Sequence, residues 1–212
     1  MEKASRLKRV KNALLVLLLF CFNGLSSQTH FGVKGGYSLS QYKWGPVRFD
    51  AQSYFYAGGY VEQPLNKNWS VQAELLYTEL GGSMKSYSEF VVTSSGLVSV
   101  DTITSQYRYP QLQIPVLFRY YAEDDFSLSG GVNFGINLGA RVEFSPSPAV
   151  AHPGKLEGVK AVNLFPFIGA SYRVIDQLSV EVRGNFGFVN MHSSEVNVTD
   201  MFLQAGLAYR LR

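Results

Sequence analysis

The chain has 212 residues, of which 46% are hydrophobic and 14% aromatic, and its 19 lysines and arginines against 16 aspartates and glutamates give a net charge of +3. Residues 1–27 hold five of the cations and one of the carboxylates, so the other residues carry 14 basic and 15 acidic groups and no basic stripe for nucleic acid. The single cysteine, Cys21, lies in the same segment, which excludes disulfides and thiolate metal sites from residues 28–212.

The first 27 residues have the three-part pattern of a secretory signal peptide. A cationic stretch that ends at Lys11 precedes an apolar run, Ala13–Phe22, and small polar residues follow it. The apolar run is too short to span a bilayer as a helix. We therefore predict that residues 1–27 are cleaved on export and that residues 28–212 form one domain.

The exported part alternates apolar residues with small or polar ones in blocks of about ten, which is typical of a transmembrane β-barrel. Turn residues divide it into eight predicted strands. The strands are Phe31–Ser40, Tyr54–Glu62, Trp69–Leu80, Tyr107–Tyr120, Phe126–Arg141, Ala161–Arg173, Leu178–Met191 and Met201–Leu211.

The connections between these strands alternate in length. The short ones are residues 63–68, 121–125 and 174–177, and the long ones are residues 41–53, 81–106, 142–160 and 192–200. Strands that run up and down would gather the short connections at one end. We predict an all-β protein, an eight-stranded antiparallel up-and-down transmembrane β-barrel with short periplasmic turns and longer extracellular loops. It would lie in the outer membrane of a Gram-negative bacterium, with both termini periplasmic.

Charged residues fall on one face of the predicted strands and aliphatic residues on the other. A charge in hydrocarbon costs several kcal/mol, so the charged faces should point to the lumen. The sixth strand does not alternate cleanly and its facing stays open. We expect a salt-bridged network that fills the lumen, and a narrow ion or proton path is the alternative. Its members are Lys34, Glu62, Glu74, Arg119, Glu181, Arg183 and Arg210.

Aromatic residues near the strand ends predict two girdles at the level of the lipid head groups. At the short-turn end they are Tyr60, Trp69, Tyr120, Tyr121, Phe126, Tyr172 and Tyr209; at the long-loop end they are Tyr37, Tyr54, Tyr56, Tyr107, Tyr109, Phe186, Phe188 and Phe202. Pro115 and Pro166 fall inside strands of a closed barrel, so we expect each at a bulge or near a strand end.

Several segments together resemble one known family. They are Phe31–Ser40, Glu74–Tyr77, Gly81–Gly82, Tyr109–Tyr120 and Leu203–Arg210, and their order and spacing resemble the PorT-like family of small outer-membrane β-barrel proteins. The resemblance implies an eight-stranded barrel and no shared enzymatic activity. The link of the family's namesake to protein secretion does not transfer on fold alone.

The long connection 81–106 predicts a hairpin that stands above the membrane. Two β-prone stretches, Tyr87–Thr93 and Leu97–Ile103, flank a turn at Ser94-Ser95-Gly96. Loops on a rigid scaffold commonly carry binding. The candidate extracellular binding residues are Tyr87, Phe90, Val92 and Leu97.

We predict no catalytic, cofactor or metal site. His192 and Ser194 are residue types that outer-membrane lipid hydrolases use, but spacing in a loop does not establish a nucleophile and its base. The predicted function is a non-enzymatic outer-membrane protein whose outward loops serve surface interaction or an envelope-structural role. Its partners would be outer-membrane lipid and, during biogenesis, the barrel-insertion machinery and periplasmic chaperones. The alternatives are a soluble exported barrel that binds an apolar ligand, with the faces inverted, and a secretion-accessory outer-membrane protein.

Overall fold

A computed structural model describes residues 29–92, 98–145, 154–156, 158–191 and 198–211. The predicted signal peptide, residues 1–27, lies outside the described residues. Within the described ranges, no helix is long and apolar enough to cross a membrane. The strands are β1 His30–Trp44, β2 Val47–Arg48, β3 Asp50–Pro64, β4 Trp69–Val92, β5 Val98–Tyr121, β6 Phe126–Asn137, β7 Arg141–Ser145, β8 Gly154–Lys155, β9 Val162–Ile175, β10 Leu178–Phe186 and β11 Val198–Arg210.

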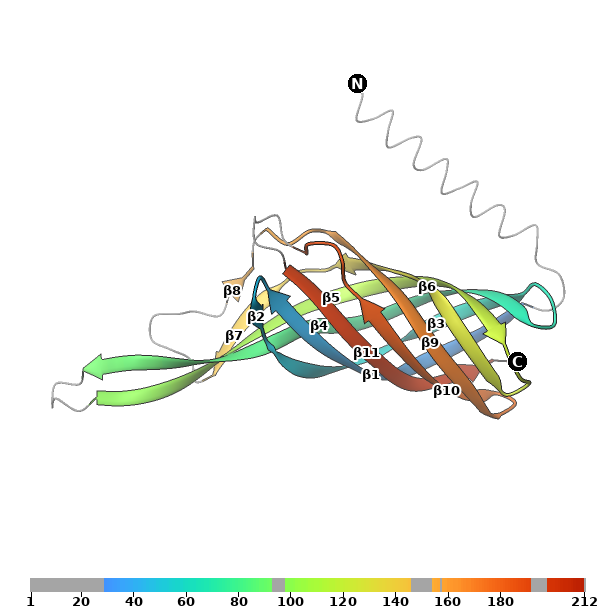
Figure 1. Ribbon diagram of the computed structural model, residues 1–212, viewed down its shortest axis with the longest axis horizontal. Helices are drawn as coiled ribbons and strands as arrows, with labels where there is room; N and C mark the ends of the chain where they lie inside the picture. Colours follow the sequence, from blue (N-terminus) through green and yellow to red (C-terminus); the bar gives the residue numbers. More distant parts are fainter. Residues whose placement is uncertain (1–28, 93–97, 146–153, 157, 192–197, 212) are drawn as a thin grey trace, which may run out of the picture.

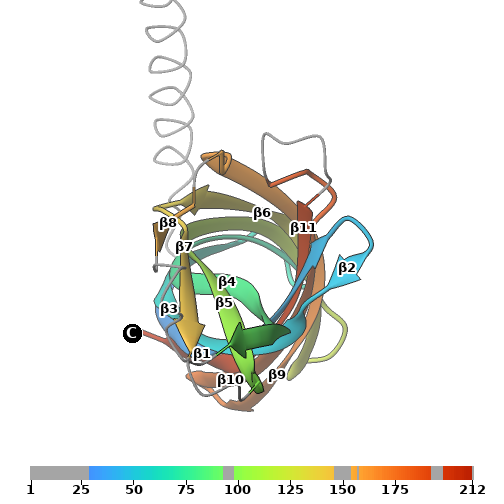
Figure 2. The same cartoon turned by 90° about the vertical axis from the view of Figure 1, so that its left-hand side faces the viewer.

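Eight of the strands close into a ring. The neighbours run in the order β4-β3-β1-β11-β10-β9-β6-β5, and β5 then pairs with β4. The pairings around the ring are antiparallel, and Figure 2 looks along the barrel from the end that carries the long loops. The predicted eight-stranded antiparallel up-and-down barrel is therefore confirmed. The short strands β2, β7 and β8 pair outside the ring, at the long-loop end.

The two ends of the barrel differ, as the loop lengths predict. Short turns connect β3 to β4, β5 to β6 and β9 to β10, and in the first of them the Asn66 side chain accepts hydrogen bonds from the backbone N–H groups of Asn68 and Trp69. The described chain also ends at this short-turn end. At the other end the β4–β5 hairpin extends far beyond the ring (Figure 1).

Several strand boundaries differ from the predicted ones, most of all in β4, which continues to Val92, and in β5, which begins at Val98. Much of the long connection 41–53 is strand, because β1 continues to Trp44 and turns through Gly45, at φ 57°, into β2. The fifth predicted strand ends at Asn137, where Gly139, at φ 152°, takes a conformation that an L-residue rarely adopts. The seventh ends at Phe186 rather than at Met191.

The predicted facing of the strands is confirmed. Aliphatic side chains such as Leu75, Phe118 and Val182 are exposed on the outer wall, whereas the charged and amide side chains are buried in the lumen. The sixth predicted strand, β9, also alternates: Leu164 and Ile168 point outward, and the buried Phe165 and Phe167 point inward. An apolar wall around a charged interior is the arrangement that a bilayer requires, and it is the reverse of a soluble ligand-binding barrel.

The girdle prediction is only partly right. Exposed aromatics at the two ends include Trp69, Tyr120, Tyr172, Tyr209 and Phe188, whereas the exposed Tyr37 lies in the middle of β1. Tyr56, Tyr109 and Phe202, by contrast, are buried inside the barrel. The two-residue period of a strand decides this, because these residues share the inward face with the polar side chains.

The two prolines behave differently from each other. Pro166 lies where the β9–β10 pairing ends, at Asn185↔Phe167, as expected of a residue without an N–H donor. The expectation of a bulge or strand end is wrong for Pro115, which lies inside β5. There the β4–β5 ladder lacks the pairs of Ile114 and Pro115, and it resumes in the same register. The missing donor is accommodated by a local gap.

The outer wall generates a first prediction. Ile168 is 66% exposed in the middle of β9, so an arginine there would enter the hydrocarbon. We expect Ile168→Arg to lower the free energy of unfolding in lipid vesicles by about 2–4 kcal/mol. Leu65→Arg, in the short turn after β3, is the matched control and should have little effect. Denaturant unfolding of both variants in vesicles checks this, and equal stabilities would contradict a membrane-embedded wall.

Candidate functional site

Five buried charges form a lattice across the lumen. The Glu74 carboxylate accepts two hydrogen bonds from Arg183, at 3.0 Å from Nη1 and 2.8 Å from Nη2, and a third from Lys34 Nζ at 2.9 Å. Lys34 also bonds Glu181, whose other oxygen accepts from Arg119 Nη2 at 2.8 Å. The ion pairs therefore run without a break from Arg183 through Glu74, Lys34 and Glu181 to Arg119.

Each ion pair of the lattice joins two strands that are not neighbours in the ring. Lys34 lies on β1, Glu74 on β4, Arg119 on β5, and Glu181 and Arg183 on β10. Removing one partner of such a buried pair leaves an uncompensated charge, whereas in the complete lattice each charge has an opposite charge as its partner. The lattice thus ties four strands together across the lumen.

The lattice has polar and aromatic support. Gln72 accepts a hydrogen bond from Arg119 at 3.0 Å and donates one to Glu74 at 2.7 Å. The Arg183 guanidinium lies 4.3 Å from the centre of the Phe167 ring, in cation–π geometry.

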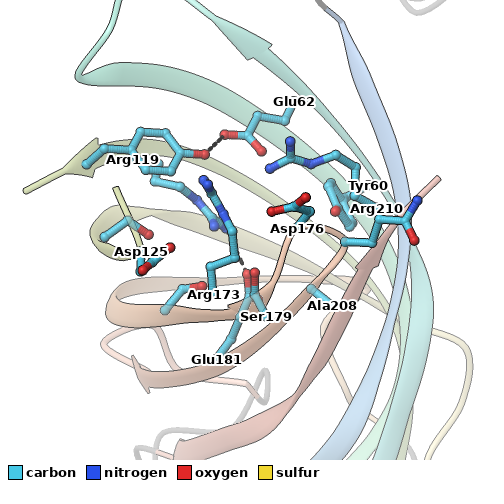
Figure 3. Close-up of a pocket in the computed structure, with 14 residues that line it drawn as sticks. Tyr60, Glu62, Arg119, Asp125, Arg173, Asp176, Ser179, Glu181, Ala208 and Arg210 are labelled. Carbon is cyan, nitrogen blue, oxygen red and sulfur yellow. Dashed lines mark hydrogen bonds and ion pairs between the residues drawn. The ribbon is translucent and has the colours of Figure 1, made fainter. Parts of the chain in front are cut away.

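The other two predicted network members lie at the mouth of the short-turn end. Glu62 accepts hydrogen bonds from the Ser70 hydroxyl at 2.5 Å and from the Tyr121 hydroxyl. Arg210 lines a hollow together with Glu62, Arg173 and Asp176 (Figure 3). The structure therefore brings five of the seven predicted charges into one lattice, and it places Glu62 and Arg210 in the mouth beside it.

A belt of amide side chains lies beyond the lattice, and sequence reasoning missed its role. Gln204 donates to Gln113 at 3.3 Å, Asn185 donates to Gln204 at 3.3 Å, and Asn133 donates to Asn185 at 3.4 Å. Each of these residues lies on an inward position of a different strand. The alternation that located the charges also places Gln113, Asn133 and Gln204 on the inward face, but it does not show that they bond to one another.

An aromatic plug fills the lumen at the long-loop end. The Tyr42 ring stacks on Tyr109 at 5.3 Å and meets Phe49 edge-on at 5.1 Å, and the Tyr109 hydroxyl donates to that of Tyr42 at 2.8 Å. Phe165 and Phe202 form a second edge-on pair at 5.1 Å. The buried cluster comprises Tyr42, Phe49, Leu80, Tyr109, Ala140, Phe165, Met191, Val198 and Phe202.

Two interior glycines make room for aromatic rings from neighbouring strands. A Cβ atom at Gly32 would lie 2.3 Å from the Tyr60 ring, and one at Gly206 would lie 2.3 Å from the Gly35 carbonyl oxygen and 2.5 Å from the Tyr56 hydroxyl oxygen. No real Cβ atom approaches other atoms so closely. These rings therefore lie directly over the bare backbone of the wall.

A second charge cluster lies on the outer wall near the long-loop end. Arg141 pairs with Glu79 at 3.3 Å and with Glu143 at 3.2 Å. Arg108 lies between the same two carboxylates, at 3.8 and 3.7 Å. These exposed pairs balance one another.

The backbones of β4 and β5 form the predicted hairpin. β4 and β5 pair from Lys85↔Thr104 to Val92↔Val98, with a register shift between Ser88 and Val91. Tyr87, Phe90 and Val92 lie in β4. Leu97 and the His192–Glu195 cluster lie outside the described residues.

The lattice generates a second prediction. Glu74 is 3% exposed, and Glu74→Gln would leave Arg183 without its carboxylate partner in the lumen and Lys34 with Glu181 alone. We expect this variant to lose about 3–5 kcal/mol of unfolding free energy. Arg141→Gln, which breaks an exposed pair, should lose about 0–1 kcal/mol. The measurement is denaturant unfolding of both variants in vesicles, and equal losses would show that the lattice does not stabilise the barrel.

Comparisons with known proteins agree with this architecture. The family described as "Outer membrane protein beta-barrel domain" matches residues 23–193. Neisserial surface protein A is similar in fold, with a TM-score of 0.58 and 11% identity over 87% of this chain and 100% of that one. Ail, the attachment invasion locus protein of Yersinia pestis, is similar with a TM-score of 0.53 and 15% identity over 87% of this chain and 99% of that one.

No curated protein is significantly similar to the chain in sequence. The family match covers most of the chain, and the two solved barrels share its fold over their whole length. The apolar outer wall agrees with both findings, and the soluble alternative is not favoured. The chain is a small outer-membrane β-barrel protein and belongs to the outer membrane protein β-barrel domain family.

Proposed function

We propose that this protein is a non-enzymatic surface-display barrel, which seals its lumen and presents the β4–β5 hairpin to the cell exterior. In this proposal the short turns and both termini are periplasmic. The observation that carries it is the contrast between a lumen filled from mouth to plug and a hairpin that extends far beyond the ring (Figure 1).

The filled lumen supports a role that does not depend on transport. The charge lattice, the amide belt and the aromatic plug follow one another along the barrel, and each consists of side chains bonded or packed to one another. An ion on this path would have to break the lattice and then displace stacked rings. This disfavours the narrow conduction path as the function.

The hairpin supports binding by strand pairing. β3 accompanies β4 only as far as Ser83, and β7 accompanies β5 only from Thr104 onward. Beyond these points, in the part of the hairpin that the structure describes, each strand pairs only with the other. An open strand edge can take up an extended segment of another protein through main-chain hydrogen bonds. We therefore favour a protein partner at the hairpin.

One of the similar barrels, Ail, has been crystallised with the heparin analogue sucrose octasulfate. The hairpin of the present chain does not have the charge for such a ligand. Between residues 84 and 104 its charged residues are Lys85, Glu89 and Asp101, which leave an acidic balance. A polyanion would be repelled rather than attracted there.

We also propose a route by which the chain reaches the outer membrane. Residues 1–27 would direct export, and periplasmic chaperones and the barrel-insertion machinery would deliver the barrel to outer-membrane lipid. The resemblance to the PorT-like family suggests that the chain is a member of that group of small outer-membrane barrels. It also keeps a secretion-accessory role as the second candidate, for which a defect in protein secretion on deletion of the gene is the test.

Sealing of the lumen is a third prediction. In planar bilayers the purified wild-type barrel should give no steady ionic current, because the lattice and the plug block the lumen in series. Tyr42→Ala combined with Tyr109→Ala should also stay closed, since the lattice remains intact in that variant. A stable open level in the wild-type protein would contradict the sealed lumen and restore the conduction alternative.

Display of the hairpin is a fourth prediction. Cys21 lies in the predicted signal peptide, so Ser95→Cys would place a lone cysteine in the exported chain. We expect a membrane-impermeant maleimide to label this cysteine on intact cells. Asn66→Cys, at a short turn, should react only after the outer membrane is permeabilised. The reverse labelling pattern would overturn the proposed orientation.

The same two cysteines test the binding role. A photoreactive maleimide on Ser95→Cys should cross-link to a surface protein, whereas the same reagent on Asn66→Cys should not give that adduct. An identical set of adducts from both positions would show that the hairpin is not a selective binding element.

A further inference from the structure

Two cations face each other on the outer wall at the long-loop end. Lys43 of β1 pairs directly with Arg48 of β2, and both side chains are exposed. The turn between these strands fixes the register, because Gly45, at φ 57°, and Pro46 form a two-residue connection. A glycine at positive φ is what the first central position of a type II′ turn requires. The pairing is thus imposed by the backbone.

No carboxylate among the described residues forms an ion pair with Lys43 or Arg48. Directly opposed like charges destabilise an antiparallel ladder. Within the described residues neither cation makes an ion pair, and Asp50, two residues after Arg48, bonds neither. The nearby arginines of the outer wall, Arg108 and Arg141, are both balanced by Glu79 and Glu143. The Lys43–Arg48 pair therefore differs from Arg108 and Arg141.

The two cations border a shallow hollow of about 340 Å³. Gln41, Thr199 and Met201 line the rest of it, and in the β1–β11 ladder Lys43 is paired with Thr199 and Gln41 with Met201. The hollow thus combines two cationic groups with a hydroxyl and a primary amide, and each of the four can donate a hydrogen bond to an anion. Figure 2 shows β1, β2 and β11 side by side at this point.

The hollow lies at the upper edge of the apolar wall. The next outward pair along the same two strands is Leu39↔Leu203, and both leucines are 49% exposed. An anion held by Lys43 and Arg48 would therefore sit directly above a lipid-facing surface. This is the level at which the head groups of the surrounding lipids lie.

We propose that this hollow binds the phosphate of a membrane-lipid head group, with an acyl chain of the same lipid lying along Leu39 and Leu203. Arg48 would form the paired hydrogen bonds that a guanidinium makes with phosphate, and Lys43 would add a point charge. Thr199 and Gln41 would donate to the remaining oxygens. A free anionic sugar would make only the polar contacts, and for this reason the lipid is the better occupant.

The proposal is independent of the orientation and of the hairpin's role. Phosphate head groups border both leaflets of a membrane, so the chemistry is the same at either face. Failure of the surface-display function would leave this site untouched.

The test is lipid binding by the full-length exported barrel in detergent, followed by native mass spectrometry. The probe is lipid A, a phosphorylated and acylated disaccharide, and the comparison lipid is phosphatidylethanolamine, which has no net charge. We expect lipid A to bind preferentially and its apparent affinity to fall at least tenfold in the double variant Lys43→Gln, Arg48→Gln. The matched control is Arg108→Gln, Arg141→Gln, which removes the same charge at the same end and should retain binding.

Three outcomes would overturn the site. Equal loss of lipid A in both double variants would mean that only total charge matters. Unchanged binding in Lys43→Gln, Arg48→Gln would place any lipid contact elsewhere. Binding of soluble sucrose octasulfate as tightly as lipid A, with loss in the same variant, would assign the hollow to an anionic sugar instead. Faster gel migration of every unheated variant would verify that each barrel is folded, so that a loss of binding reports on the site.

Discussion

A backbone N–H or C=O group inside a bilayer has no water to bond, and the rest of this structure depends on that constraint. An open sheet would leave one row of such groups on each edge strand. The antiparallel pairing of β4 with β5 removes both edges by closing the ring. The long hairpin is a continuation of this same pairing, so the element that closes the barrel also provides the part that extends farthest from it.

Closing the ring with only eight strands narrows the interior enough for side chains to fill it. The charges, amides and aromatic rings occupy successive levels. Glu62 and Arg210 lie at the short-turn mouth, and the charges just beyond it are paired in the lattice. The aromatic plug closes the other end by packing. The interior therefore changes from mainly charged to mainly aromatic along one axis.

Much of this architecture could be predicted from the sequence, because alternation and loop length are local signals. Strand number, facing and five lattice members followed from where charges such as Glu74 and Arg183 fall in the two-residue period. The positions of the aromatic residues were harder to predict. Tyr56 and Phe202 are residue types that girdles contain, but in the two-residue period of their strands they fall on the side that faces the lumen. The alternation places Gln113 on the inward face, but the hydrogen-bonded amide belt was missed because amides such as Gln113 and Asn185 carry no charge that marks them as partners of one another.

Other features depend on contacts between distant segments, which no local pattern contains. The pairing of Lys43 with Arg48 follows from a two-residue turn in a segment that reads as a long loop. The gap beside Pro115 is likewise visible only once β4 is aligned with β5. Local sequence thus defines each strand, and the register between strands defines the sites.

The interior glycines have a consequence for how this family can evolve. Gly32 lies beneath Tyr60, and the ring occupies the space of the missing side chain. At Gly206, by contrast, an added Cβ atom would also lie 2.3 Å from the Gly35 carbonyl oxygen, so a smaller residue at position 56 would not make room for it. A larger residue at position 32 is tolerable only if position 60 becomes smaller at the same time. Homologous barrels should therefore show coupled substitutions at positions 32 and 60, which should covary although they lie on different strands.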